Sequence, residues 1–166
     1  MTTLVLGIDS GLDGAFAWHH GGRILGHLAT RKLLDSERRL DFGAIREWCQ
    51  LVNAKAPDAP RVAFIEEPFA PKGRERGVMG SWRRYGQLET LLWFHQYEVV
   101  GVRAQAWQRG LGFATGDTKE QSIAYVRANY PDVNLIPPRA RNPHDGLADA
   151  VCIAVWGSTQ VKETSP

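Results

Sequence analysis

The sequence predicts a single α/β domain built on a five-stranded mixed sheet. Three short, apolar, strand-like segments follow one another early in the chain, and later strand-like segments alternate with helical ones. Short links make the first three strands antiparallel neighbours, whereas helical crossovers place the fourth and fifth parallel to the first. The expected strand order is therefore 3-2-1-4-5, with helices flanking the sheet.

Each element has a local signal. The expected strands cover residues 3–8, 15–19, 23–29, 62–65 and 98–103, with a glycine-rich turn after the first and a hairpin at His20-Gly21-Gly22. Asp41 is the expected N-cap of a helix over 42–54, and Thr118 opens a capping box for a helix over 118–129. Further helices are expected over 81–96 and 106–109. A last helix should begin at Asn142 as N-cap and end before Gly157.

Length and composition exclude several classes of protein. A chain of 166 residues is 43% hydrophobic and 23% charged, which suits one globular domain over 1–158 with a flexible tail over 159–166. Since no apolar run approaches about 18 residues, no membrane helix is expected. Residues 1–8 run into a strand-like segment instead of a basic-then-apolar leader, so we do not expect secretion, and Cys49 and Cys152 do not form a CxxC pair. We therefore expect a cytoplasmic protein with buried free thiols.

The small net charge of +2 conceals clustered arginines, which make up fifteen of the 20 basic residues. Arginine is the planar, bidentate partner of phosphate, and phosphate contacts position nucleic acids. A solvated charged loop is the plain alternative. The candidate DNA contacts are a glycine-rich basic stretch with its following helix, the segment before the last helix, and one helix N-terminus: Lys72, Arg74, Arg76, Arg83, Arg84, Arg139, Arg141 and Lys119.

Two carboxylates are expected side by side at the carboxyl edge of the sheet. Asp9 ends the first strand and Glu66 ends the fourth, which should be its parallel neighbour. Ligands of open α/β sheets bind at this edge. Two adjacent carboxylates repel each other unless a cation or a proton intervenes.

The last helix carries two more acids, Asp145 and Asp149, four residues apart on one face. Asp145 is also explained by its place in the first helical turn. Asp149 lies in an apolar stripe, where an unpaired charge is costly, so it should have a partner. Mg²⁺ or Mn²⁺ suits an all-carboxylate site, and two such ions about 4 Å apart form a clamp for phosphodiester hydrolysis.

Four segments give the chain a resemblance to the RuvC-like Holliday junction resolvases of the ribonuclease H-like superfamily, especially the compact phage-encoded versions. They are Leu6-Gly-Ile-Asp-Ser-Gly11, Phe64-Ile-Glu-Glu-Pro-Phe69, Tyr85-Gly-Gln87 and His144-Asp-Gly-Leu-Ala-Asp-Ala-Val-Cys-Ile-Ala154. The resemblance implies a ribonuclease H-like fold and an acidic tetrad of Asp9, Glu66, Asp145 and Asp149 that binds two Mg²⁺ ions, with Mn²⁺ as a substitute. It also implies that Phe69 wedges into the junction. The classical bacterial enzymes space the last two acids three residues apart instead of four, which leaves His144 as an alternative to Asp145.

The expected function is metal-dependent nicking of four-way or related branched DNA, leaving 5′-phosphate and 3′-hydroxyl ends, in a bacterial cell or a phage-infected host. Paired nicks suit a twofold homodimer, with Tyr85, Leu88, Leu92 and Trp93 of the long helix as candidate interface. Trp82, Phe94 and Trp107 are expected in the core or an interface. The alternatives are a ribonuclease H acting on RNA–DNA hybrids, a non-catalytic junction-binding module, and an actin-like sugar kinase, which would require a second domain.

Overall fold

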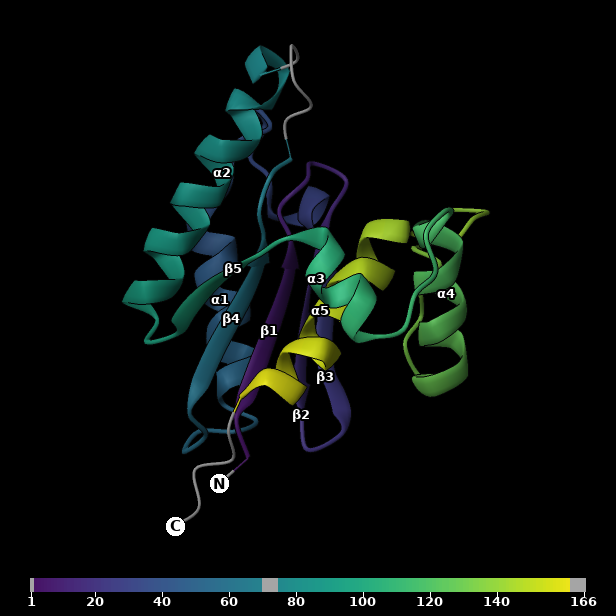
Figure 1. Ribbon diagram of the computed structural model, residues 1–166. Coiled ribbons are helices and arrows are strands. Elements are labelled where there is room, and N and C mark those ends of the chain that lie inside the picture. The colour runs from purple at the N-terminus through teal and green to yellow at the C-terminus, as the bar shows by residue number, and fades with distance from the viewer. Residues whose placement is uncertain (1, 70–74, 162–166) are drawn as a thin grey trace.

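The computed structural model describes residues 2–69 and 75–161, without the side chains of residues 75–77. Its sheet has five strands in the order β3-β2-β1-β4-β5 (Figure 1). They are β1 (Leu4–Asp9), β2 (Ala15–His20), β3 (Arg23–Ala29), β4 (Arg61–Glu66) and β5 (Glu98–Val102). β1, β2 and β3 pair antiparallel, and β4 and β5 run parallel to β1. The predicted order and directions are confirmed, and the fold is ribonuclease H-like.

Helices cover both faces of this sheet (Figure 1). α1 (Phe42–Asn53) and α2 (Glu75–Phe94) lie on one face; α3 (Ala104–Gly110), α4 (Thr118–Asn129) and α5 (Asp145–Gln160) lie on the other. A short 3-10 helix, Thr30–Leu33, follows β3. Because side chains alternate along a strand, Leu4, Leu6 and Ile8 of β1 join the core beneath α1 and α2. Val5 joins the core beneath α5.

α5 packs on β1 without an intervening side chain at Gly7. A Cβ atom at this position would lie 2.3 Å from both the Ala150 carbonyl oxygen and the Ala154 nitrogen. Residues 146–148 and 150–155 of α5 are buried, so the helix is apolar on nearly every side. This contact places the amino end of α5 beside the carboxyl end of β1, at the top of Figure 1.

Several helix boundaries differ from the sequence prediction. α2 begins at Glu75 instead of residue 81, because its glycines are accommodated within the helix. The N-cap of α4 is Asp117, whose carboxylate accepts from the Glu120 N–H, and not Thr118. The predicted end of α5 before Gly157 is wrong: a Cβ there would lie 2.4 Å from the Phe64 ring, so this glycine permits close packing within a helix that continues to Gln160.

Packing in the core determines which side chains of α2 remain exposed for contacts with other molecules. Leu88 and Leu92 are buried beneath α2, so the prediction that they form an interface is wrong. Trp82, Trp93 and Phe94 are exposed rather than in the core, whereas Trp107 is fully buried, as expected. Cys49 and Cys152 are buried free cysteines, also as expected. Among the described residues, no helix combines the length and apolar character needed to cross a membrane.

Gly7→Ala should destabilise the protein because the added methyl group would overlap the backbone of α5. Overpacking costs about 1–3 kcal/mol, which in a chain of this size lowers the melting temperature by about 2–12 °C. Gly86→Ala is the matched control, since a Cβ at this helical position meets nothing within 4 Å. It should raise stability by about 0.5–1 kcal/mol. Thermal unfolding followed by circular dichroism measures both, and equal effects would contradict this account of the α5 contact.

Candidate active site

Asp9 and Glu66 lie side by side, as predicted. The parallel register pairs Gly7 with Phe64 and Ile8 with Ile65, so the next residues along, Asp9 and Glu66, end adjacent strands. Strand alternation directs both side chains to the face covered by α5. The carboxyl ends of β1 and β4 and the amino end of α5 therefore meet at one end of the molecule (Figure 1).

The Asp9 carboxylate is oriented by the turn that follows it. Its Oδ1 accepts a hydrogen bond of 2.9 Å from the Gly11 N–H. Gly146 of α5 packs against the other side, because a Cβ there would lie 2.9 Å from Asp9 Oδ2 and 2.4 Å from the Asp13 carbonyl oxygen. The first turn of α5 thus rests directly on the loop that carries Asp9.

Glu66 is held by two residues that the sequence did not mark as functional. The Trp107 indole N–H donates to Glu66 Oε2 at 2.8 Å. The buried Ser10 hydroxyl donates to the Glu66 carbonyl oxygen at 3.0 Å and ties the ends of β1 and β4 together. Ser10 lies next to the predicted acid, which was the available signal. Nothing along the chain pairs Trp107 with Glu66, 41 residues away.

α5 supplies Asp145 and Asp149 from successive turns. Its N-cap is His144, whose Nδ1 accepts from the Leu147 N–H at 3.0 Å, so the predicted cap at Asn142 is wrong. The accepting Nδ1 leaves the proton of the neutral ring on Nε2, which disfavours His144 as a replacement ligand for Asp145. Asp145 Oδ2 pairs with Lys119 Nζ of α4 at 2.5 Å.

Burial and mutual repulsion push three of the four carboxyl groups toward their neutral form. Burial raises the pKa of Glu66 to about 7, and the charges of Asp9 and Asp149 add to the shift against the Trp107 hydrogen bond. Burial likewise raises the pKa of Asp149 to about 7, although the Ser122 hydroxyl opposes the shift. The pKa of Asp9 is raised by burial and by Asp145, against the Gly11 hydrogen bond.

Asp145 behaves differently from the other three acids. Its partial burial would raise its pKa, but hydrogen bonds from Lys119 and the Gly146 N–H outweigh this and hold the pKa below its usual value. Among the described residues, Lys119 forms its ion pair with Asp145, and its charge acts on Asp9 and Asp149 only from farther away. The carboxylates of Asp9, Glu66 and Asp149 therefore have the greatest need for a cation.

The chemistry of this donor set fits a hard divalent cation, because oxygen ligands and unneutralised negative charge are what Mg²⁺ and Mn²⁺ prefer. Asp9, Glu66, Asp145 and Asp149 are the residues that could hold such ions. Within residues 2–69 and 75–161, no three acidic, histidine or cysteine side chains are yet close enough together to hold one ion.

The residues predicted to contact DNA differ in their exposure and in the contacts that they already make within the protein. Arg83, Arg139 and Arg141 are exposed, and Phe69 is 75% exposed just after β4. Arg84 is half-buried: its Nη2 donates to the Ser81 hydroxyl at 3.0 Å, and its Nε makes a long hydrogen bond of 3.4 Å to the Ser10 carbonyl oxygen. Lys119 is engaged with Asp145. Lys72, Arg74 and the side chain of Arg76 lie outside the described residues.

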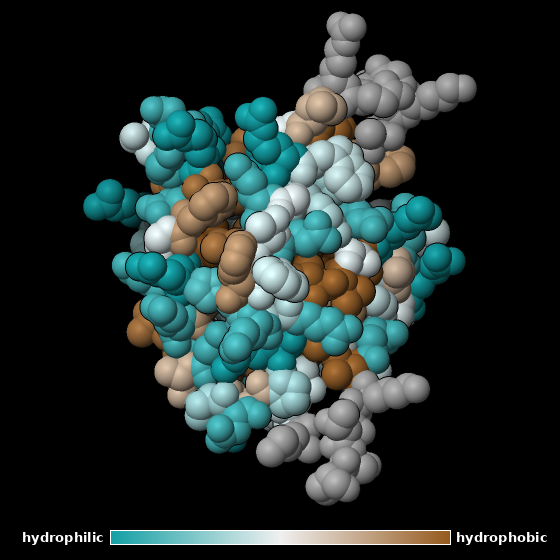
Figure 2. All heavy atoms as spheres, turned by 90° about the vertical axis from the view of Figure 1, so that its left-hand side faces the viewer, coloured by the Kyte–Doolittle hydropathy of each residue, from teal (hydrophilic) through white to brown (hydrophobic). Residues whose placement is uncertain are grey.

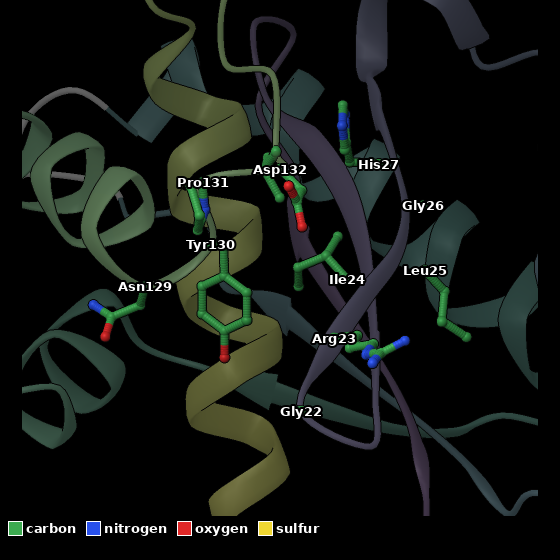
Figure 3. Close-up of a pocket in the computed structure, with 11 residues that line it drawn as sticks. Gly22, Arg23, Ile24, Leu25, Gly26, His27, Asn129, Tyr130, Pro131 and Asp132 are labelled. Atoms are coloured by element: carbon green, nitrogen blue, oxygen red, sulfur yellow. The ribbon is translucent and has the colours of Figure 1, made fainter.

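A separate hollow of about 560 Å³ lies between β3 and the segment that follows α4. Ile24 and Asp132 lie toward Tyr130 there, whereas Leu25 points away (Figure 3). None of the four predicted acids lines this hollow. The carboxylates instead lie at the carboxyl ends of β1 and β4 and in the first turns of α5.

Solved structures with the same fold include RuvC of Thermus thermophilus. One, RuvC in complex with a Holliday junction substrate, aligns over 93% of this chain and 92% of its own with a TM-score of 0.58 and 19% identity. A second structure of the same protein aligns over the same shares with the same TM-score and 20% identity. No protein-family model and no curated protein matches the chain significantly. This likeness confirms the predicted fold over nearly the whole chain.

Asp149→Asn should stabilise the metal-free protein at alkaline pH. The pKa of Asp149 rises from 3.8 to about 7 on folding, so the stability associated with its protonated form is lost as pH rises toward 7. The variant has no proton to lose there. Its melting temperature in EDTA should therefore exceed that of the wild type by more at pH 8.5 than at pH 5. In a chain of this size, each kcal/mol of unfolding free energy corresponds to about 2–4 °C in melting temperature.

Asp58→Asn, at an exposed position, is the control and should show no such pH dependence. If Asp149→Asn and the wild type differ in melting temperature by the same amount at both pH values, the raised pKa of Asp149 is contradicted.

Proposed function

We propose that this protein is a metal-dependent endodeoxyribonuclease that nicks Holliday junctions or related branched DNA. The observation that supports this most is the meeting of Asp9, Glu66 and Asp149, from three separate elements, with the pKa of each raised by burial. Such a group favours a divalent cation over a neutral ligand. The fold adds support, because a RuvC of the same fold is known in complex with a Holliday junction substrate.

In this proposal Asp9, Glu66, Asp145 and Asp149 hold two Mg²⁺ ions, which Mn²⁺ can replace. Bound divalent ions supply positive charge that polarises a phosphodiester and lowers the pKa of a water molecule. The chain's own part is to orient the carboxylates, through the Gly11 N–H for Asp9 and the Trp107 indole for Glu66, while Ser10 holds the Glu66 backbone beside β1. Hydrolysis leaves 5′-phosphate and 3′-hydroxyl ends.

The same proposal assigns DNA binding to the basic residues around the carboxylates. Arg83, Arg139 and Arg141 are exposed and can contact phosphates. The proposal also includes Lys72, Arg74 and Arg76 on the strength of their basic side chains, which lie outside the described part of the chain. When a metal ion binds the Asp145 carboxylate, the Lys119 ammonium group can leave Asp145 and bind a phosphate oxygen instead. Phe69, being large, apolar and exposed, suits the role of a wedge between the arms of a junction.

We further propose a twofold homodimer, because resolution of a four-way junction requires two symmetric nicks. Apolar side chains gather between polar ones on the face formed by α1 and α2, which Figure 2 shows. Its exposed members are Phe42, Leu51, Met79, Trp82, Trp93 and Phe94. Contiguous exposed apolar surface of this kind marks interaction sites. Trp93 and Phe94 are 68% and 71% exposed and would be the centre of the interface.

Cleavage of defined substrates tests the enzyme assignment. Labelled four-way junction, linear duplex and RNA–DNA hybrid are incubated with Mg²⁺, Mn²⁺ or EDTA. We expect paired nicks in the junction only with metal. Asp9→Asn should lower the rate by more than about 1,000-fold while junction binding persists, since removing a ligand forfeits several kcal/mol of transition-state stabilisation. Asp58→Asn should cleave normally.

Other outcomes of the same experiment would identify one of the alternative functions. Cutting confined to the hybrid would indicate a ribonuclease H, and binding without cleavage by the wild type under every metal condition would indicate a junction-binding module. Equal cutting of linear duplex would contradict selectivity for branched DNA.

Sedimentation velocity tests the dimer. Trp93→Glu with Phe94→Glu should convert a dimer to a monomer, since burying two charges at the centre of an interface is costly. The matched control is Ile136→Glu, which alters an exposed apolar residue on a different segment and should leave the dimer intact. A wild-type monomer at micromolar concentration would overturn the homodimer.

A further inference from the structure

Trp107 is a core residue with one polar contact that packing does not explain. Its side chain is 1% exposed, and its indole N–H donates to Glu66 Oε2 at 2.8 Å. Buried indole N–H groups usually find a partner, and a backbone carbonyl would satisfy that need. Here the partner is a carboxylate at the end of β4, among the other acids of the site.

An indole suits this position because it donates once, accepts nothing and carries no charge. It donates to Oε2 of Glu66, while Oε1 receives no hydrogen bond from the part of the chain that the structure describes. A lysine or arginine in its place would add a positive charge that neutralises the carboxylate and repels a cation. Trp107 therefore orients Glu66 without competing for its charge.

The donor is itself immobile. Trp107 belongs to the core cluster that includes Leu147 and Val151 of α5, and the Phe113 ring packs edge-on at 5.9 Å. A free glutamate loses side-chain entropy when it is fixed. Because Trp107 is fixed by packing, Glu66 is ordered when the protein folds and not when an ion binds.

The neighbouring acids are oriented differently. Asp9 is held by the Gly11 N–H two residues along its own turn, and Asp145 by the side chain of Lys119. The Glu66 carboxylate instead receives its hydrogen bond from Trp107 of α3, a residue of the core beneath α5. From this geometry we propose that Trp107 is a positioning residue that prepares Glu66 to bind a divalent metal ion.

This inference rests on the proposed metal-dependent function, so its test measures metal binding separately from DNA cleavage. Calorimetric titration of the free protein with Mn²⁺ compares the wild type with Trp107→Phe, which keeps an aromatic ring and removes the donor. Loss of such an outer hydrogen bond costs about 10–100-fold in metal affinity. We expect at least a 10-fold loss, together with a lower kcat on four-way junctions and an unchanged KM.

Trp18→Phe is the matched control. Trp18 is also 1% exposed and its Nε1 also donates a hydrogen bond, to Tyr97 Oη at 3.2 Å, but it lies in the core beneath α1 and α2. Both variants remove a buried indole and one hydrogen bond, so both should lower the melting temperature. Only Trp107→Phe should weaken Mn²⁺ binding.

If Trp107→Phe does not fold, site-specific replacement of Trp107 by benzothienylalanine decides the matter, because this side chain keeps the shape of tryptophan and lacks only the N–H. Wild-type affinity for Mn²⁺ in whichever of these variants folds would overturn the positioning role and leave the proposed function standing. Equal losses in the Trp107 and Trp18 variants would also overturn it. Absence of Mn²⁺ binding by the wild type would overturn both the inference and the proposed metal dependence.

Discussion

The direct packing of α5 on β1 is the contact on which the arrangement of the carboxylates depends. At Gly7 the helix backbone occupies the place where a side chain would lie, and at Gly146 the first helical turn rests against the loop after Asp9. These two close approaches determine how far along the strand the helix sits. They bring Asp145 and Asp149 to the end of the sheet where Asp9 and Glu66 emerge. A helix held one side chain farther away would carry the same acids away from the strand ends.

Convergence of the acids creates an electrostatic cost that the surrounding residues do not fully remove. Burial disfavours the charged forms of Asp9, Glu66 and Asp149, and each ionised group disfavours the next. Neutral donors hydrogen-bond to Asp9 and Glu66, and one cation, Lys119, pairs with Asp145. Neutral donors orient a carboxylate without cancelling its charge. The remaining charge is the basis for proposing divalent ions here.

Local and periodic signals accounted for much of the fold. Turn residues between β1, β2 and β3 and the alternation of later strands with helices were enough for the strand order, because short links force antiparallel neighbours. The adjacency of Asp9 and Glu66 followed from that order. Asp149 stood out as a charge within an apolar stripe. Boundaries that depend on packing were less predictable: Gly157 has the sequence signature of a helix end, yet it lies inside α5 against Phe64.

The sequence by itself determined the strand order, the pairing of two strand ends that carry acids, and the helix face shared by Asp145 and Asp149, because each follows from neighbours along the chain. Only the tertiary structure decided which group orients each acid. The Trp107–Glu66 hydrogen bond joins residues 41 positions apart, and the Lys119–Asp145 pair joins residues 26 apart on different helices. No local pattern encodes such pairs, since they arise where separate elements pack against one another and bring a donor within reach of a carboxylate.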